Sequence, residues 1–398
     1  MPNLGSFCSL CGEAAVVDCF DLKMQPLANK YPASEQDKRN EFMQQMTGRF
    51  CKSCRSIHLP SEQPRSVFFE EYFYLSSVNN ELVKHFEELA KQLENRKLVV
   101  DVGSNDGVLL RPLKKLGVRA IGVDPSENVG ALANAEGLET LISFFEQDTA
   151  HQIAEKYGKP DCIVASSVFT HMEDPSAFLR LAGDLISDDG LIIVEVEYIA
   201  EIIKTISFER FYFDRPYYFS LSSVMKMAEQ HGLTVLDVAM VDVHGGSLQL
   251  HICKSSNNVE PTDRVTAMLK QEAAVLTMEA IQERFNKFED AVSNLKQQIA
   301  EIKRSGRSVF GYGCPARLST ITNFGDIDSN LIEAVIEDSP LKAGRFSPGK
   351  HIPIIPLHNI QKQVDMFVVF AFEYIDSIKA KTNSMKCDYF KPIPFQKL

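Results

Sequence analysis

The pattern of apolar and polar residues changes period along the chain, and these changes mark the predicted elements. Between Asn79 and Lys97, apolar residues recur at the spacing of an amphipathic helix. Short apolar runs typical of buried strands follow, separated by stretches long enough for helices: KLVVDVG, VRAIGVD, ETLISFF, DCIVASS and GLIIVEVE. This alternation predicts a parallel, doubly wound sheet, and LTVLDVAMVDVHGGSLQLHICK predicts an antiparallel hairpin at its edge.

The same reasoning divides the rest of the chain. Residues 1–78 read as loop-rich with two cysteine turns, and the polar, proline-terminated NNVEP at 257–261 reads as a linker. A long helical pattern at 262–303 and the strand candidates SVFGYG, LIEAVIED and DMFVVFA predict a further Rossmann-like unit. We therefore expect an α/β protein with three domains, at 1–78, 79–256 and 257–398.

Length and charge narrow the range of partners. A chain of 398 residues exceeds one ordinary core, and 44% hydrophobic with 24% charged residues is typical of a globular protein. A net charge of -11 argues against nucleic acid and membrane surfaces as partners, because both select basic faces. The sequence shows no signal peptide and no apolar run long enough to span a bilayer. We expect a cytoplasmic protein that acts on a small molecule.

Four of the nine cysteines form two C-x-x-C turns, Cys8 with Cys11 and Cys51 with Cys54. Two residues between cysteines let both thiolates of a turn face one tetrahedral ion, so the doubled turn predicts structural zinc. The alternatives are two unrelated pairs or a redox-active C-x-x-C.

A glycine turn follows the first predicted strand of the central unit, in DVGSNDG from Asp101 to Gly107. Gly103 and Gly107 permit a tight turn close to a ligand, and Asp124 ends the next strand where a carboxylate accepts ribose hydroxyls. The turn lacks the G-x-G-x-x-G of dinucleotide folds. Its acidic residues suit the cationic S-adenosylmethionine, and Asn105 joins the cofactor-binding candidates. A turn without a ligand is the alternative.

Several motifs together resemble one family, the sugar C-methyltransferases that act on nucleotide-linked deoxysugars. They are the doubled C-x-x-C, MQPLAN, YFYLSS, VVDVGSNDGVLL, VDPSENV, HGGSL, GYGCPAR and GRFSPGKHIPI, in this order along nearly the whole chain. The resemblance implies a small N-terminal zinc-binding domain, a central Rossmann-like class I methyltransferase and a C-terminal Rossmann-like domain. It also implies methylation at C3 of a 4-ketosugar: a base removes the acidic C3 proton, and the enolate carbon attacks the sulfonium methyl.

The resemblance further implies which residues meet the substrate. The family's Tyr-x-Glu-His segment, whose histidine is the expected base, corresponds to Tyr212, Asp214 and Arg215. His171 matches a histidine near the substrate. Further substrate-binding candidates are Tyr72, Tyr74, His244 and Arg317.

The replacement of histidine by Arg215 separates this chain from the family pattern. Arginine keeps its proton at physiological pH, so another group must act as the base, and His171 titrates in the useful range. Arg215 then binds an acidic group of the acceptor, steadies the enolate, or pairs with Asp214 or another acid. His171 alternatively caps the helix after it. The competing functions are O- or N-methyl transfer, and binding of S-adenosylmethionine without catalysis.

Overall fold

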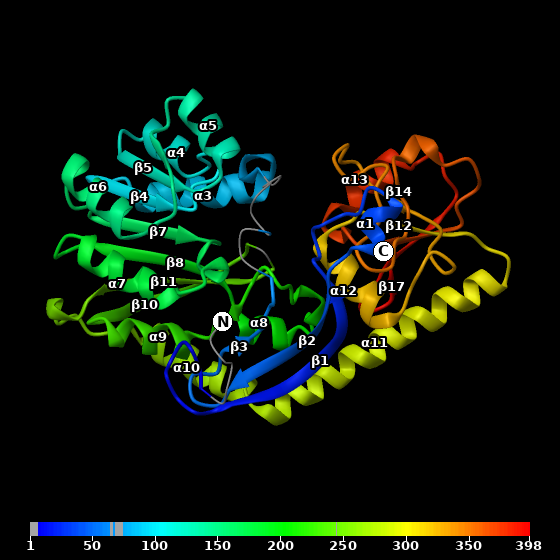
Figure 1. The fold of residues 1–398 in the computed structure, drawn as a ribbon, viewed down its shortest axis with the longest axis horizontal. Coiled ribbons are helices and arrows are strands. Elements are labelled where there is room, and N and C mark those ends of the chain that lie inside the picture. The colour runs from blue at the N-terminus through cyan, green and yellow to red at the C-terminus, as the bar shows by residue number, and fades with distance from the viewer. Residues whose placement is uncertain (1–6, 64–66, 68–74, 244) are drawn as a thin grey trace.

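The computed structural model describes residues 7–63, 67, 75–243 and 245–398, and it folds into two lobes (Figure 1). One lobe holds the central sheet and the other holds the C-terminal sheet. Long strands near the N-terminus and a long helix run beneath both lobes and join them. Within the described residues, no helix is both long enough and apolar enough to cross a bilayer.

The central sheet has the strand order β10-β11-β8-β7-β4-β5-β6, in which β8, β7, β4, β5 and β6 are parallel. β11 pairs antiparallel with β8 and β10 with β11, which confirms the predicted edge hairpin. The strands are β4 Leu98–Val102, β5 Arg119–Asp124, β6 Thr140–Ile142, β7 Cys162–Ser166, β8 Leu191–Glu197, β10 Leu233–Val241 and β11 Ser247–Lys254. The helices are α3 Asn80–Gln92, α4 Leu110–Lys115, α5 Glu127–Ala135, α6 Gln147–Tyr157, α7 Pro175–Leu185, α8 Ile199–Lys204 and α9 Leu221–Gln230.

The C-terminal sheet has the order β14-β13-β12-β15-β16-β17 and is parallel except for its last pair. The predicted single helix before it is two helices, because Leu276 and Thr277 interrupt it and Thr277 caps the second one. The strands are β12 Val309–Tyr312, β13 Val335–Ile336, β14 Ile354–Ile355, β15 Met366–Val369, β16 Asp388–Lys391 and β17 Gln396–Lys397. The helices are α10 Asp263–Val275, α11 Met278–Arg304, α12 Ala316–Gly325 and α13 Ile375–Lys381.

The N-terminal residues contain more regular structure than their sequence suggests. They form β1 Val16–Pro26, α1 Glu35–Arg39, β2 Met43–Cys51 and β3 Ile57–His58, and the sheet is completed by β9 Tyr217–Tyr218 from the FYFDRPYYF segment. Two register shifts interrupt the pairing of β1 with β2, and Lys23 has a φ of 62°. These irregularities break the two-residue period by which a strand is recognised, which explains why the loop-rich reading of this segment was wrong.

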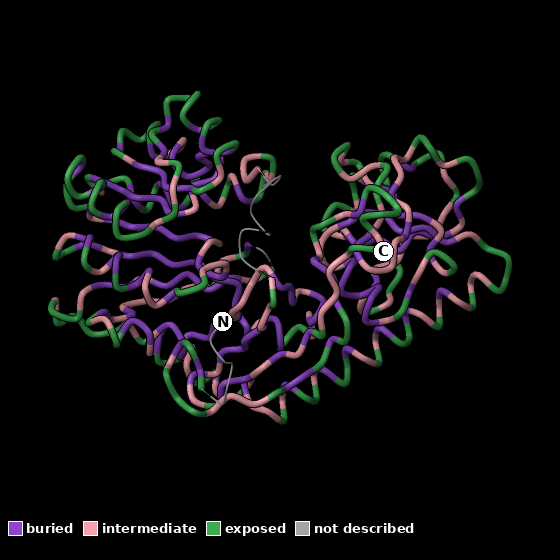
Figure 2. The backbone as a smooth tube through the Cα atoms, viewed as in Figure 1, coloured by how far each residue is buried: buried purple, intermediate pink, exposed green. Residues whose placement is uncertain are grey.

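The backbone beneath the lobes is largely buried (Figure 2), and aromatic side chains from distant segments pack together in the core. Phe20 of β1 packs against Phe208, Phe211 and Phe285, with ring centroids 4.6–5.5 Å apart. Five of the six rings of FYFDRPYYF are buried, and Phe211, Tyr218 and Phe219 are fully so, as expected of core packing. Short 3-10 helices are η1 Ser76–Val78, η2 Phe169–His171, η3 Phe208–Arg210, η4 Ser255–Asn257, η5 Leu357–Asn359 and η6 Phe372–Tyr374.

Candidate active site

A cleft of about 2130 Å³ separates the two lobes. One wall consists of the segments at the carboxyl ends of β4, β5, β7 and β8, where ligands bind in open parallel sheets. The other wall includes residues 27–32 and the turn after β13. The cleft exceeds the volume of an ordinary single-ligand pocket, so it has room for two ligands side by side.

The predicted glycine turn lies in this cleft, and a hydrogen bond from a backbone amide of the turn to a side chain of β5 holds it to that strand. The amides of Asn105 and Ser126 both donate to the Asp124 carboxylate, at 2.9 Å each. Gly103 has a φ of 76°, and a Cβ there would lie 2.7 Å from Cβ of Val168. Only glycine fits this position, and the two amides fix the Asp124 carboxylate in the cleft.

Asp101 stands at the end of β4 and is buried, and it lines the same cleft. Burial, together with the nearby carboxylates of Asp124 and Glu195, raises its pKa to about 8. A cationic ligand beside it would favour the ionised form. The acidic donor set of Asp101 and Asp124 therefore fits the ammonium, sulfonium and ribose of S-adenosylmethionine.

His171 ends η2, after β7, and faces the cleft. Its Nδ1 lies 2.8 Å from the backbone oxygen of Asp214, which can only accept a hydrogen bond. We therefore assign the hydrogen of neutral His171 to Nδ1, so that Nε2 carries the basic lone pair. The following helix, α7, is capped by the side chain of Asp174, and this excludes the helix-capping role considered for His171.

Arg215 lines the cleft and is paired with a carboxylate that sequence reasoning missed. Its Nη1 lies 2.6 Å from Oε1 of Glu197, and the other oxygen of Glu197 lies 2.8 Å from Nη2 of Arg210. Burial disfavours the charge on Arg215, but Glu197 outweighs this effect and raises the pKa of the guanidinium. The ion pair considered from the sequence thus exists, with Glu197 and not Asp214 as the acid. Glu197 could have been recognised from the sequence as a carboxylate at the end of an apolar, buried strand, β8.

The remaining site residues suggested by the sequence do not lie together. Tyr212 is buried, with its ring 5.3 Å from the Arg215 guanidinium, and Gly107, with a φ of 81°, packs against Leu138. Arg317 pairs with Glu373 at 2.6 Å within the C-terminal lobe. The substrate-binding candidates Tyr72, Tyr74 and His244 lie outside the described residues.

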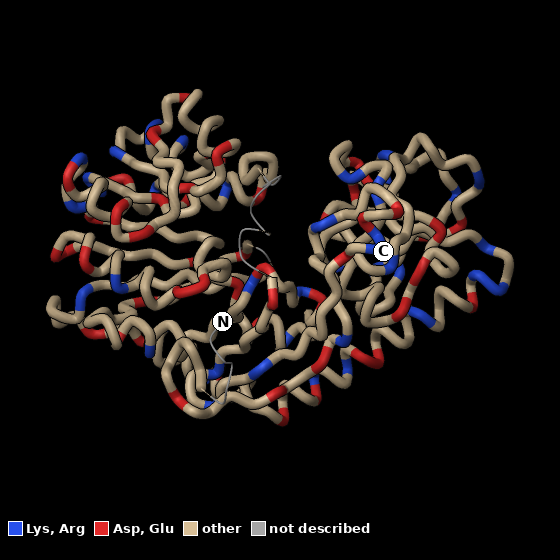
Figure 3. The backbone as a smooth tube through the Cα atoms, in the orientation of Figure 1, with Lys and Arg blue, Asp and Glu red and all other residues tan. Residues whose placement is uncertain are grey.

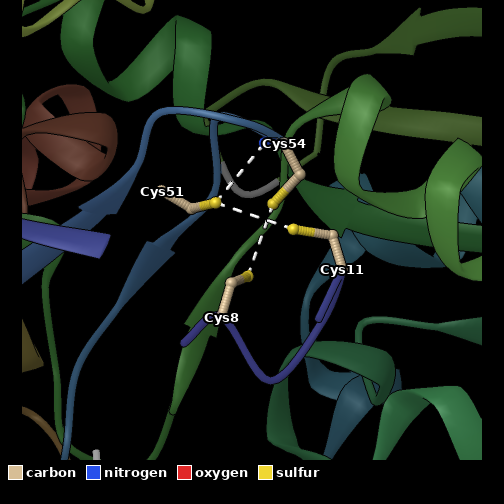
Figure 4. A group of neighbouring side chains, drawn as sticks. All are labelled: Cys8, Cys11, Cys51 and Cys54. Atoms are coloured by element: carbon tan, nitrogen blue, oxygen red, sulfur yellow. Dashed lines mark hydrogen bonds between the residues drawn. The ribbon is translucent and has the colours of Figure 1, made fainter. Parts of the chain in front are cut away.

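The four cysteines of the two C-x-x-C turns come together, with their sulfurs pointing toward one another (Figure 4). All four sulfurs lie within 4.8 Å of one another, with 3.6 Å between Cys8 and Cys54 and 3.7 Å between Cys11 and Cys51. A zinc ion about 2.3 Å from four sulfurs holds them about 3.8 Å apart, so the cluster fits zinc. His58 Nε2 lies 3.3 Å from the Cys8 sulfur. A donor there would stabilise a thiolate ligand.

Comparisons with known proteins give the class of enzyme. Residues 74–238 match a family profile described as a methyltransferase domain, and residues 242–394 match a C-methyltransferase C-terminal domain. The C-methyltransferase NovU of Streptomyces niveus is 29% identical over 382 residues, covering 93% of this chain and 90% of that protein. The chain is an S-adenosylmethionine-dependent methyltransferase.

Further similar proteins cover a smaller share of this methyltransferase. A ubiquinone biosynthesis O-methyltransferase of Azorhizobium caulinodans is 32% identical over 123 residues, covering 30% of this chain and 49% of that protein. Among solved structures, magnesium protoporphyrin IX methyltransferase of Synechocystis PCC 6803 with bound SAH has a TM-score of 0.35 and 18% identity. That comparison covers 48% of this chain and 93% of the other. The class I fold of the methyltransferase is evident from its own strand order.

Proposed function

We propose that this methyltransferase transfers a methyl group from S-adenosylmethionine to a carbon of a nucleotide-linked 4-ketodeoxysugar or a closely related acceptor. The similarity to a C-methyltransferase over nearly the whole chain supports transfer to carbon. The single observation that carries the proposal is His171, an orientated imidazole in the same cleft as the cofactor turn. A carbon acceptor needs such a base, because only the enolate carbon is nucleophilic.

The cofactor belongs on the wall formed by Asp101, Gly103, Asn105 and Asp124, and Gly107 shapes the turn behind this wall. S-adenosylmethionine supplies the electrophilic methyl when bound. Asp124 accepts the ribose hydroxyls, and Asp101 faces the cationic end of the cofactor. Gly103 provides the positive φ that the turn needs and packs against Val168. This arrangement leaves the other wall of the cleft for the acceptor.

His171 takes the proton of the carbon acid through Nε2. The Nδ1 hydrogen bond to the Asp214 carbonyl holds the ring and becomes stronger when the imidazole is charged. The imidazolium lies near the carboxylate of Asp214, whose Oδ2 is 3.8 Å from Nδ1. Asp214 therefore orients the base with its backbone and steadies its charge with its side chain.

Arg215 would steady the negative charge that develops on the keto oxygen. Glu197 holds one terminal nitrogen of the guanidinium, and the Nε of Arg215 is buried without a hydrogen-bond partner among the described residues. A fixed cation at a forming enolate lowers the barrier, because it needs no reorganisation during the reaction. Tyr212 positions the guanidinium through its ring.

We also propose that Cys8, Cys11, Cys51 and Cys54 bind a structural zinc ion. Four thiolates complete a closed tetrahedral shell and leave no position for a substrate. β3 follows the second cysteine turn and pairs with β9, so the cluster fixes the strand that continues from Arg215. All nine cysteines lie in described segments and none forms a disulfide, which suits a reducing, cytoplasmic location.

The test is mass spectrometry of products from methyl-labelled S-adenosylmethionine and a panel of nucleotide 4-ketosugars, run in parallel in D₂O. We expect a carbon-methylated product and exchange of the C3 hydrogen for deuterium when cofactor is absent. His171→Ala should lower both rates about 10²–10⁴-fold while cofactor binding persists. Arg264→Gln, which alters an exposed ion pair with Asp237, is the matched control and should leave both rates unchanged.

Three results would contradict the proposal or the roles given to its residues. Methylation of oxygen or nitrogen without C3 exchange would assign the protein to the alternative class of O- or N-methyltransferases. Cofactor binding with no transfer to any acceptor of the panel would indicate a binding protein. Full activity of both His171→Ala and Arg215→Gln would remove the roles given to these side chains.

A further inference from the structure

A buried carboxylate, Glu195, lies on the face of the central sheet that carries Asp101. The middle strands of this sheet carry few charged positions (Figure 3), and β7 carries none. The side chain of Glu195 in β8 is nevertheless fully buried. A buried charge is costly unless other groups pair with it and donate hydrogen bonds to it. The partners of Glu195 therefore indicate its role.

The register of the sheet places Glu195 directly behind the cofactor wall. Ser166 of β7 is in register with Glu195, and Asp101 of β4 is in register with Val164, two residues before Ser166. Because side chains two residues apart project from the same side of a strand, Asp101, Ser166 and Glu195 share one face. Asp101 and Ser166 both line the cleft. Glu195 is close enough to Asp101 to contribute, after burial and Asp124, to the raised pKa of that carboxyl group.

Three neighbouring elements contact the Glu195 carboxylate. Nε2 of His85 in α3 lies 2.9 Å from Oε1, and Nε2 of Gln249 in β11 donates to Oε1 at 2.7 Å. The hydroxyl of Ser166 donates to Oε2. The backbone oxygen of Glu195 also accepts the amide of Ser167, a cleft residue with a φ of 61°, at 3.1 Å. Glu195 thus fixes the turn after β7 with its side chain and with its backbone.

The contact between His85 and Glu195 is an ion pair. Burial disfavours both charges, but the hydrogen bond and the attraction between the two groups outweigh it, so the pKa of His85 is raised and that of Glu195 is lowered. Glu88 of the same helix also favours the charge on His85. Nε2 of His251 lies 3.0 Å from Oε1 of Gln249, and burial lowers the pKa of His251, so this imidazole is neutral. His85 is therefore a cation that partly cancels the charge of Glu195.

The ion pair determines what Ser166 can offer to a ligand. An ionised carboxylate only accepts hydrogen bonds, so the hydroxyl hydrogen of Ser166 is directed at Glu195. The Ser166 oxygen then has only lone pairs left for the cleft. This suits an ammonium group, which only donates, and it does not suit an anion.

We propose that His85 and Glu195 form a positioning pair for S-adenosylmethionine, which makes Ser166 an acceptor for the cofactor's ammonium and sets how readily Asp101 releases its proton when the cofactor binds. The negative charge of Glu195 holds the proton on Asp101, and the positive charge of His85 limits this effect. The inference rests on the proposed placement of the cofactor beside Asp101. It does not depend on the identity of the acceptor.

Calorimetric titration of the full chain with S-adenosylmethionine, from about pH 6 to about pH 8.5, tests the pair without any turnover. Glu195→Gln removes the negative charge beside Asp101, so the affinity should level off about one pH unit lower than in the unaltered chain. His85→Gln keeps a donor to Glu195 but removes the positive charge. Its affinity should level off about one pH unit higher and be about tenfold weaker at pH 7. A merely structural defect would weaken binding at every pH and would not move the two profiles in opposite directions.

Two further variants complete the test. Ser166→Ala should bind the cofactor about tenfold more weakly at every pH, with an unchanged profile, because it removes an acceptor and no charge. His351→Gln is the matched control, since Nε2 of His351 lies 2.7 Å from a carboxylate oxygen of Glu41 in the C-terminal lobe, and it should bind as the unaltered chain does. Circular dichroism of each variant verifies its fold. The cofactor's own amine titrates equally in every experiment, so differences between variants report on the protein.

The outcomes separate the pair from the placement of the cofactor. Opposite shifts in the Glu195 and His85 variants support the pair, even if no 4-ketosugar is methylated. Shifts in the same direction, or no shift, would reject it while Asp101→Asn still removes the pH dependence and so keeps the cofactor beside Asp101. Binding that Asp101→Asn leaves unchanged at every pH would reject both the placement and the pair. Full affinity of Ser166→Ala would remove the role given to that hydroxyl.

Discussion

Replacing Asp101 with asparagine should abolish a proton release that accompanies cofactor binding. Asp101 is buried at the end of β4, where burial and the neighbouring acids Asp124 and Glu195 raise its pKa to about 8. In the cofactor-free protein the carboxyl group is therefore largely protonated at neutral pH. The ammonium and sulfonium of S-adenosylmethionine favour the carboxylate, so binding should drive the proton into solution.

The size of this effect follows from the pKa. At pH 7, a group with a pKa of about 8 is protonated in about nine-tenths of the molecules. If the cofactor lowers the pKa to about 6, binding releases about 0.8 proton per chain. A starting pKa of about 7 would still give a release of about 0.4 proton. Both values are large enough to measure.

Calorimetric titration in two buffers of different ionisation enthalpy measures the number directly. The slope of the observed enthalpy against the buffer enthalpy gives the protons exchanged. The amine of the cofactor also titrates, but it contributes equally to both proteins, so the difference between the unaltered chain and Asp101→Asn isolates Asp101. Asp188→Asn is the control, since Asp188 is exposed on the surface and pairs with Lys254. S-adenosylhomocysteine, which lacks the sulfonium charge, should release less.

The sign of the pH dependence is equally defined. A pKa that is raised in the free protein and lowered in the complex makes the affinity increase with pH and level off above about 8. The asparagine variant should lose this slope. Equal proton release by the unaltered chain and Asp101→Asn would refute the reasoning, and so would an affinity that falls between pH 6 and 8.

Three further predictions concern the cysteine cluster, the ion pair of Glu197 and the glycine turn. Cys51→Ser should lose bound zinc by elemental analysis and unfold at a lower temperature, whereas the lone thiol variant Cys387→Ser should keep its metal. Glu197→Gln should cost about 3 kcal/mol in denaturant unfolding, because it leaves two largely buried arginines, whereas Glu373→Gln, 42% exposed, should cost about 0–1 kcal/mol. Gly103→Ala should weaken cofactor binding about tenfold or more, because its Cβ would meet Val168. Gly117→Ala has a similar φ of 78° but no atom within 4 Å, so it should show only backbone strain of about 1–2 kcal/mol and bind normally.

The central sheet was predictable because its signals are local. A buried parallel strand is a continuous apolar run, and each of the five predicted runs became a strand of the sheet, β4 to β8. The glycine turn and the spacing to Asp124 are also local. β1 and β2 were missed because register shifts and the positive φ of Lys23 interrupt their alternation. The neighbouring strand determines such irregularities, and a single segment does not show them.

The strands of the central sheet, the paired cysteine turns and the glycine turn could be read from the sequence, because each depends on residues close together in the chain. The partners of the charged groups in the cleft became visible only in the folded chain. Asp214 orients His171 from 43 residues away. Glu197 forms an ion pair with Arg215. Tyr31 contacts Lys342 through its ring and Arg345 through its backbone oxygen, although both lie more than 300 residues later in the chain. Ion pairs, tautomers and shared carbonyls depend on distances of a few ångströms in space, and spacing along the sequence carries no record of them.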